Sequence, residues 1–298
     1  MLKKVFIILI FFTQTLFSEK VNLGIYIVNI GKFEVATGNF NVDFYLTIKT
    51  ESANQFPLDS FEFMNGRATH IEKIYSEKNM HQYRILANLT SPVDLRKFPF
   101  DEQTLSIIIE NKKFTIDQVR YKILENETGI DDSIVFTGWK LKGWKILESE
   151  HKYKVFNEIY SLVSLNIIIE KIKINALFKT FIPVLIIIFL VACCSIMDID
   201  KVKERLGICT SCLVASVMLH LSISNQIPPV SYLTYADKFM ILTYMVLMLS
   251  VILNVLIMQL VQKQKENQAV KLNRIAKYIT VIILPSTYSV FFYLCFQT

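Results

Sequence analysis

The stretch SPVDLRKFPFDEQTL, residues 91–105, is the most distinctive part of this chain of 298 residues. At its centre Phe98 and Phe100 flank Pro99, and Asp101 follows directly. Because proline fixes φ and supports tight turns, including turns with a cis peptide bond, we predict a rigid loop here. The loop would carry an apolar tip beside an acid, which suits docking against a second, apolar domain.

The sequence on both sides of this loop predicts β-strands. From 40 to 49, apolar side chains alternate with polar ones, which is the period of a strand with one buried face. Turn-prone residues separate further strands, which are predicted at 24–30, 82–89, 104–110, 119–124, 139–147 and 161–174. This series of short strands without a helical period predicts an all-β immunoglobulin-like sandwich over residues 19–174.

The composition indicates two domains in two solvents. Hydrophobic residues make up 52% of the chain and charged residues only 19%, against about a quarter charged in soluble globular proteins. Most of the charge precedes residue 174, and long apolar runs fill the remainder. The net charge of +6 forms no basic patch with interleaved aromatics, so we expect no nucleic-acid partner.

The first residues resemble an export signal. Lys3 and Lys4 precede an apolar run at 5–12, and a small, polar segment ends near Ser18. This apolar run is too short to cross about 30 Å of hydrocarbon. We therefore predict a signal peptide at 1–18, an extracellular or periplasmic amino-terminal domain, and a location in the cell (inner) membrane.

Four apolar runs predict an all-α, four-helix transmembrane domain over 175–298. They lie at about 178–197, 206–224, 239–260 and 275–296, and each is long enough to span a bilayer. The loop at 262–274 is rich in lysine and arginine, so the positive-inside rule makes it cytoplasmic. We expect a multi-pass protein in contact with membrane lipid, with its carboxyl end outside.

The second run differs from the others because hydroxyl side chains interrupt it. Steps of three and four residues place one stripe on a helix face, made of Gly207, Ser211, Val214, Met218, Leu221 and Asn225. In a symmetric ring, the apolar girdle of Val214, Met218 and Leu221 can close a pore by dewetting. Glu204 stands at the predicted cytoplasmic mouth, where rings of carboxylates select cations. The alternative is an ordinary helix face packed in a bundle.

The cysteines and histidines predict neither an enzyme nor a metal or cofactor site. Cys209 and Cys212 have C-x-x-C spacing but sit in an apolar helix without a second ligand pair, so we expect packing roles. The four histidines lack metal spacing, and no nucleophile–base pair is visible. His220 lies off the polar stripe, so we expect it to pack between helices.

The loop at 91–105 resembles the signature loop of the pentameric ligand-gated ion channels, the Cys-loop receptor superfamily, which carries F-P-F-D-x-Q. Animal members bracket this loop with two cysteines that have thirteen residues between them. Ser91 and Leu105 stand in those two places, so the signature disulfide is absent, as in bacterial members. The chain is thus identified as a prokaryotic-type member of this superfamily.

The resemblance extends to the predicted pore helix. Glu204-Arg-Leu-Gly207 resembles its start in cation-conducting members, and Asn225-Gln-Ile-Pro228 resembles its outer end. Anion channels carry Pro-Ala where Lys203 and Glu204 stand. The resemblance therefore implies a homopentamer, in which this chain assembles with four further identical subunits. This channel would pass monovalent cations and open to a small-molecule or proton agonist that acts between extracellular domains.

The resemblance also implies roles for individual positions. Coupling between the domains is expected at the matching residues Glu34, Lys97, Phe98, Pro99, Asp101, Lys171, Pro228, Pro229 and Tyr232. Ligand binding is expected among Phe61, Phe63, Asn65, Arg84, Phe114, Tyr153, Phe156 and Tyr160. The agonist stays open, because aromatics can cage a cation, Arg84 favours an anion, and exposed carboxylates can take up protons.

One other functional class fits the same domain order. A membrane-tethered receptor or sensor that does not conduct would also combine an exported sandwich with a four-helix bundle. The polar stripe and Glu204 argue against it, because a simple tether needs no hydroxyls in the middle of the membrane.

Overall fold

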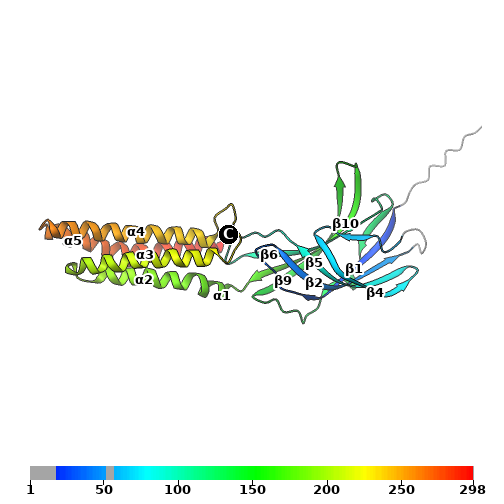
Figure 1. Ribbon diagram of the computed structural model, residues 1–298, viewed down its shortest axis with the longest axis horizontal. Helices are drawn as coiled ribbons and strands as arrows, with labels where there is room; N and C mark the ends of the chain where they lie inside the picture. Colours follow the sequence, from blue (N-terminus) through cyan, green and yellow to red (C-terminus); the bar gives the residue numbers. More distant parts are fainter. Residues whose placement is uncertain (1–17, 52–56, 298) are drawn as a thin grey trace, which may run out of the picture.

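The computed structural model describes residues 18–51 and 57–297. The predicted signal peptide at 1–18 lies outside the described residues except for Ser18. A β-rich part and a bundle of helices lie end to end, and the chain crosses between them once, after β10 (Figure 1). The prediction of a β-sandwich followed by helices is confirmed.

Two sheets form the sandwich. The first has the order β4-β5-β2-β1-β7, with β8 beside β1; the bounds are β1 (Glu19–Ile30), β2 (Asn39–Thr50), β4 (Gly66–Glu77), β5 (Met80–Thr90), β7 (Val119–Ile123) and β8 (Gly129–Ile130). The second has the order β3-β6-β10-β9; the bounds are β3 (Phe61–Phe63), β6 (Glu102–Asn111), β9 (Trp139–Tyr153) and β10 (Glu158–Lys171). A short 3-10 helix, Glu125–Glu127, links β7 to β8.

The core lies between the two sheets and follows the alternation seen in the sequence. On β2, Val42, Phe44 and Leu46 are buried, and the antiparallel register sets Leu46 opposite Ile25 of β1. Burying a side chain of this size contributes roughly 1.5–3 kcal/mol. Strand β4 was not predicted, because nearly all its side chains are exposed and leave no alternating pattern.

The helical part begins directly after β10. Its α-helices are α1 (Lys173–Ala176), α2 (Ile182–Ile196), α3 (Val202–Ser224), α4 (Tyr235–Gln262), α5 (Glu266–Tyr278) and α6 (Leu284–Gln297). Two π-helical turns, Leu177–Phe181 and Ile279–Ile283, continue the helical path from α1 to α2 and from α5 to α6. A 3-10 turn, Ile199–Lys201, precedes α3.

Three helical stretches in the described part of the chain are long and apolar enough to cross a membrane. They are Lys173–Ile196, Ile199–Ser224 and Tyr235–Gln262, and they cover the first three predicted spans except for Met197. The fourth predicted span, 275–296, falls on the end of α5, the second π-helical turn and α6. As a membrane span it stays a prediction.

Candidate functional site

The proline loop packs against the end of the helices that faces the sandwich. Phe98 is 4% exposed and Leu95 is fully buried, in one apolar cluster with Phe181 and Phe239. The ring of Phe100 stacks on that of Phe181, with centroids 5.4 Å apart. The peptide bond before Pro99 is cis. The apolar tip therefore lies against the second domain, where its composition suggested.

Backbone hydrogen bonds fix this contact at the start of α4. The amides of Tyr235 and Ala236 donate to the carbonyls of Arg96 and Phe98, each at 3.1 Å. The first amides of a helix lack acceptors within the helix, so the loop supplies them. The hydroxyl of Tyr232, one of the predicted coupling residues, accepts from the amide of Leu95 at 2.9 Å.

The charged coupling positions are more dispersed than the resemblance implies. The Lys171 ammonium lies 4.7 Å from the centre of the Trp139 ring, and within the described residues it forms no ion pair with Asp101. Glu34 is half exposed and lies 3.9 Å from Lys32. Of the other predicted coupling positions, Lys97 and Pro229 are exposed, and Pro228 is half-buried beside the loop into α4.

Asp101 is buried at the junction with incomplete hydrogen bonding. It is 1% exposed, its Oδ2 accepts from the Gln103 amide at 2.9 Å, and its Oδ1 has no partner among the described residues. Burial raises the pKa of this carboxyl, although Gln103 and the Lys171 charge oppose the shift. The junction therefore favours the neutral acid more than water does.

The predicted pore stripe lies on the outer surface of the single chain. All six residues of the stripe are exposed, as is Glu204 at the start of the same helix; the exposed fractions of Val214, Met218 and Leu221 are 63%, 65% and 56%. The opposite face of α3 is buried, and there Cys209 and Cys212 pack with Val191 and Leu247. The stripe is thus not used for packing within this chain.

Arg205 points away from Glu204. The guanidinium is 1% exposed, and its Nη1 donates to Asn273 of α5 at 2.8 Å. Glu204 is exposed and forms no ion pair among the described residues. It borders a cleft of about 440 Å³ between α2 and α3, which Gly207 and Ser211 also line.

Three of the predicted ligand residues come together near the tip of the β9–β10 hairpin, which projects from the sandwich (Figure 1). Tyr153, Phe156 and Tyr160 line a cleft of about 270 Å³. The rings of Tyr153 and Tyr160 meet edge to face with centroids 5.5 Å apart. Phe156 is 70% exposed, so the cleft is open to water on one side.

Carboxylates supply the polar part of this cleft, in the form of Glu62, Glu110 and Glu158. Tyr153 donates its hydroxyl proton to Glu110 at 2.9 Å, and the His151 ring nitrogen Nδ1 lies 2.6 Å from the other oxygen of Glu110. Burial and the Glu110 carboxylate raise the pKa of Tyr153 to about 12. The sequence analysis missed both Glu110 and His151. The only signal for this pair was that Glu110 places an acid at a buried position of a strand.

The other predicted ligand residues lie elsewhere. Phe61 and Phe63 form ring contacts with Tyr83 and Phe44, and Phe114 packs against the sandwich core. Asn65 donates from its amide to two backbone carbonyls, at 2.9 Å and 2.7 Å, and so holds β5 to β6. Arg84 pairs with Asp43 on the outer face of the first sheet, at 2.9 Å.

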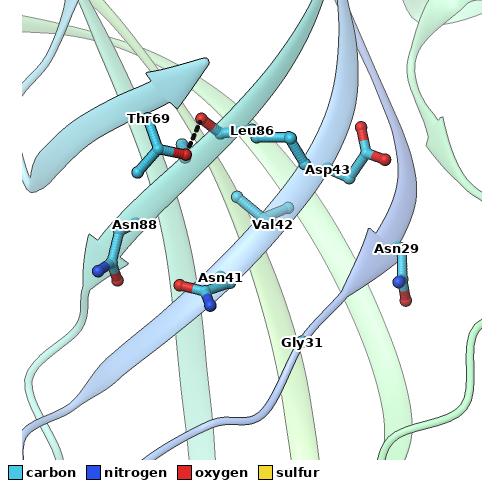
Figure 2. A pocket seen from close by; sticks show the side chains of 9 residues that line it. Asn29, Gly31, Asn41, Val42, Asp43, Thr69, Leu86 and Asn88 are labelled. Carbon is cyan, nitrogen blue, oxygen red and sulfur yellow. Dashed lines mark hydrogen bonds between the residues drawn. The ribbon is translucent and has the colours of Figure 1, made fainter.

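Figure 2 shows another cleft, of about 370 Å³, on this outer face. Asn29, Asn41 and Asn88 project into it from β1, β2 and β5, and the Thr69 hydroxyl donates to the Leu86 carbonyl at 3.0 Å. None of the predicted site residues lines it. Its lining is amide-rich, with Asp43 as the one acid.

Comparison with known proteins identifies relatives that are ion channels. No protein-family model matches the chain. A proton-gated ion channel from Gloeobacter violaceus is 20% identical over 256 residues, which cover 78% of this chain and 71% of that protein. The human neuronal acetylcholine receptor subunit alpha-6 is 22% identical over 175 residues, or 57% of this chain and 34% of the receptor subunit.

A third relative extends the comparison. Ligand-gated ion channel 50 from Caenorhabditis elegans is 21% identical over 186 residues, which cover 62% of this chain and 38% of that protein. The chain thus matches only about a third of the length of these animal relatives. Together with the sandwich-and-helix fold and the docked proline loop, these relatives confirm the resemblance of the chain to the Cys-loop superfamily of pentameric ligand-gated ion channels.

Proposed function

We propose that five copies of this chain form a homopentameric, ligand- or proton-gated channel in the cell membrane. In this proposal, residues 19–174 form the extracellular domain and 175–298 the pore domain, with the path from α5 to α6 as the fourth span. The outward position of the polar stripe on α3 is the main support. A five-fold arrangement would turn this face toward a common axis, with the girdle of Val214, Met218 and Leu221 as the gate.

Cation selectivity follows from the charges at the cytoplasmic end of α3. Two basic residues flank Glu204 in the sequence and would weaken an anionic ring if they lay beside it. Arg205 is buried and hydrogen-bonded to Asn273, so its charge is directed into the bundle. The Arg205 charge would therefore not neutralise a ring of Glu204 side chains, and the negative potential of such a ring attracts cations.

The aromatic and acidic cleft at the β9–β10 hairpin is the proposed agonist site. Carboxylates near aromatic faces favour a positively charged group, and this cleft contains Glu62, Glu110 and Glu158 beside two tyrosines. Arg84 no longer favours an anionic ligand, because Asp43 already neutralises it. The site would be completed by the neighbouring subunit.

Unitary currents test the channel proposal against the non-conducting receptor. Purified pentamers in a planar bilayer, exposed to a pH series and to a panel of amines and carboxylates, should show discrete openings. Persistent silence from correctly inserted pentamers would favour a receptor that signals without conducting.

Reversal potentials in asymmetric salt test the selectivity assignment. Glu204→Ala should move the reversal potential toward that of a non-selective pore, because the ring of carboxylates is lost. Glu266→Ala is the matched control, since Glu266 begins α5 outside the stripe. An unchanged reversal potential in Glu204→Ala would remove Glu204 from the filter.

A further inference from the structure

The end of the helical bundle farthest from the sandwich holds the start of α3 and α5 (Figure 1). Arg205, in the first turn of α3, is 1% exposed, and its Nη1 donates to Oδ1 of Asn273 on α5 at 2.8 Å. The two residues are 68 positions apart in the chain, so only the packing of the helices brings them together.

Most hydrogen-bond donors of Arg205 lack this kind of support. A guanidinium has five N–H donors, and the Nε and Nη2 atoms of Arg205 are buried without an acceptor among the described residues. Within the same residues Arg205 forms no ion pair. A buried charge with a single neutral partner is unfavourable. The Asn273 side chain is therefore the one polar contact in the described part of the chain that holds this charge inside the bundle.

The face of α5 that carries Asn273 is fixed to the bundle before and after this residue. Ala269 and Ala276 are buried, and small side chains let helices approach closely. Lys277, one turn after Asn273, donates from Nζ to the carbonyl of Ile196 at the end of α2, at 3.2 Å. The position of Asn273 is therefore set by the packing of the proposed fourth span.

Glu204 precedes Arg205 in the sequence but has the opposite surroundings. It is exposed and lines the cleft between α2 and α3. Consecutive residues of a helix do not face each other, so the two side chains diverge as long as Arg205 is held. A released arginine is long enough to extend its charge to the aqueous end of the helix. There it would add one positive charge per subunit to the mouth that Glu204 occupies.

We infer that Asn273 is a positioning residue that sets the ion selectivity of the pore, because it holds the Arg205 charge away from the ring of Glu204 side chains. The inference rests on the proposed channel function and deepens it: a side chain of the fourth span, outside the pore stripe, determines the net charge at the pore mouth. Opposite charges close to one another reduce the local potential. Loss of Asn273 therefore weakens the cation preference although Glu204 is unchanged.

Reversal potentials in asymmetric salt test this effect. Asn273→Leu removes the acceptor at similar side-chain size, and the cation-to-anion permeability ratio should fall at least about five-fold. Asn273→Asp supplies an acceptor again and should keep the ratio within about two-fold of wild type. Asn267→Leu, the same change at an exposed position of α5, is the matched control and should leave the ratio unchanged.

Arg205→Gln separates the charge from the fold. The neutral amide can still donate to Asn273, so this change alone should leave the permeability ratio within about two-fold of wild type. In the Arg205→Gln background, Asn273→Leu should have no further effect, because no charge remains to be released. An equal fall of the ratio in both backgrounds would show that Asn273→Leu acts through the fold, and would overturn the inference.

A chemical measurement follows Arg205 without any current. The water-soluble arginine reagent p-hydroxyphenylglyoxal is applied to the pentamers in nanodiscs, and mass spectrometry gives the modification rates of Arg205 and of the exposed Arg274. In wild type, Arg205 should react at least about ten-fold more slowly than Arg274. Asn273→Leu should remove most of this protection, and Asn267→Leu none of it. Asn273→Ala, which only truncates the side chain, serves in the same way if Asn273→Leu fails to assemble.

The outcomes separate the inference from the channel proposal. A permeability ratio in Asn273→Leu equal to that of wild type overturns the inference, and so does a wild-type Arg205 that reacts as fast as Arg274. If none of the pentamers conducts, the channel proposal fails on its own, and the modification rates decide whether Asn273 holds Arg205. Equal Arg205 rates in wild type and Asn273→Leu would then overturn the inference as well.

Discussion

The two ends of the sandwich use aromatic side chains in opposite ways. At the helix-facing end, Phe98 is 4% exposed and packs into the apolar cluster that joins the domains. At the β9–β10 end, Phe156 is 70% exposed, and Tyr153 and Tyr160 stand among carboxylates. One end is closed and can transmit a displacement, whereas the other is open and can accept a charged ligand.

The same two strands connect both ends. β6 begins directly after Asp101 of the proline loop and ends at Asn111, next to Glu110 of the open cleft. β10 pairs with β6 from Leu162, opposite Glu110, to Glu170, opposite Glu102. A shift at the open end would therefore reach the closed end through a continuous hydrogen-bonded ladder, without crossing the core.

Removing the apolar anchor of the closed end should have the largest effect. Phe98→Ala should lower the free energy of unfolding by about 3–5 kcal/mol, since it empties a buried aromatic site. Denaturant unfolding of the purified protein measures the loss. The control Phe156→Ala should change stability by no more than about 0.5 kcal/mol. Equal losses would show that the two ends do not differ in the way that burial indicates.

A smaller effect is expected from the tyrosine hydroxyl in the open cleft. Tyr153→Phe removes a donor to Glu110, which is 1% exposed, and should cost about 1–3 kcal/mol in the free energy of unfolding. Tyr160→Phe is the matched control, because Tyr160 donates to the exposed Glu158. If the control loses as much stability, Glu110 does not organise the cleft.

The smallest effect concerns the pH dependence of the closed end. Burial raises the pKa of Asp101 above its usual value of 3.8, so the folded chain holds this proton to higher pH than the unfolded chain. The stability that Asp101 contributes is complete below pH 3.8 and is lost as pH rises through the folded-state pKa.

Asp101→Asn should remove this part of the pH dependence. Thermal unfolding of variant and wild type across mildly acidic pH measures it, with Asp94→Asn as control, since Asp94 is exposed in the same loop. A wild-type profile that runs parallel to the Asp101→Asn profile would mean that the carboxyl ionises normally in the folded protein.

Much of this architecture could be predicted from local patterns. The alternation at 40–49 is the buried face of β2, and the apolar runs are helices, because period and length reflect one element at a time. The same logic missed β4, whose side chains face solvent. It also grouped Phe61 with Tyr153, although the ring of Phe61 packs against Tyr83.

The sequence by itself determined the two domains, the apolar tip of the proline loop and the polar stripe on α3. Only the tertiary structure decided which partner each polar side chain contacts: Arg205 contacts Asn273, Lys171 lies over Trp139, and His220 contacts Asp237. The physical reason is range. Hydropathy and turn preference act between neighbours in the chain, whereas these polar contacts join residues far apart in it and depend on how whole helices and sheets pack.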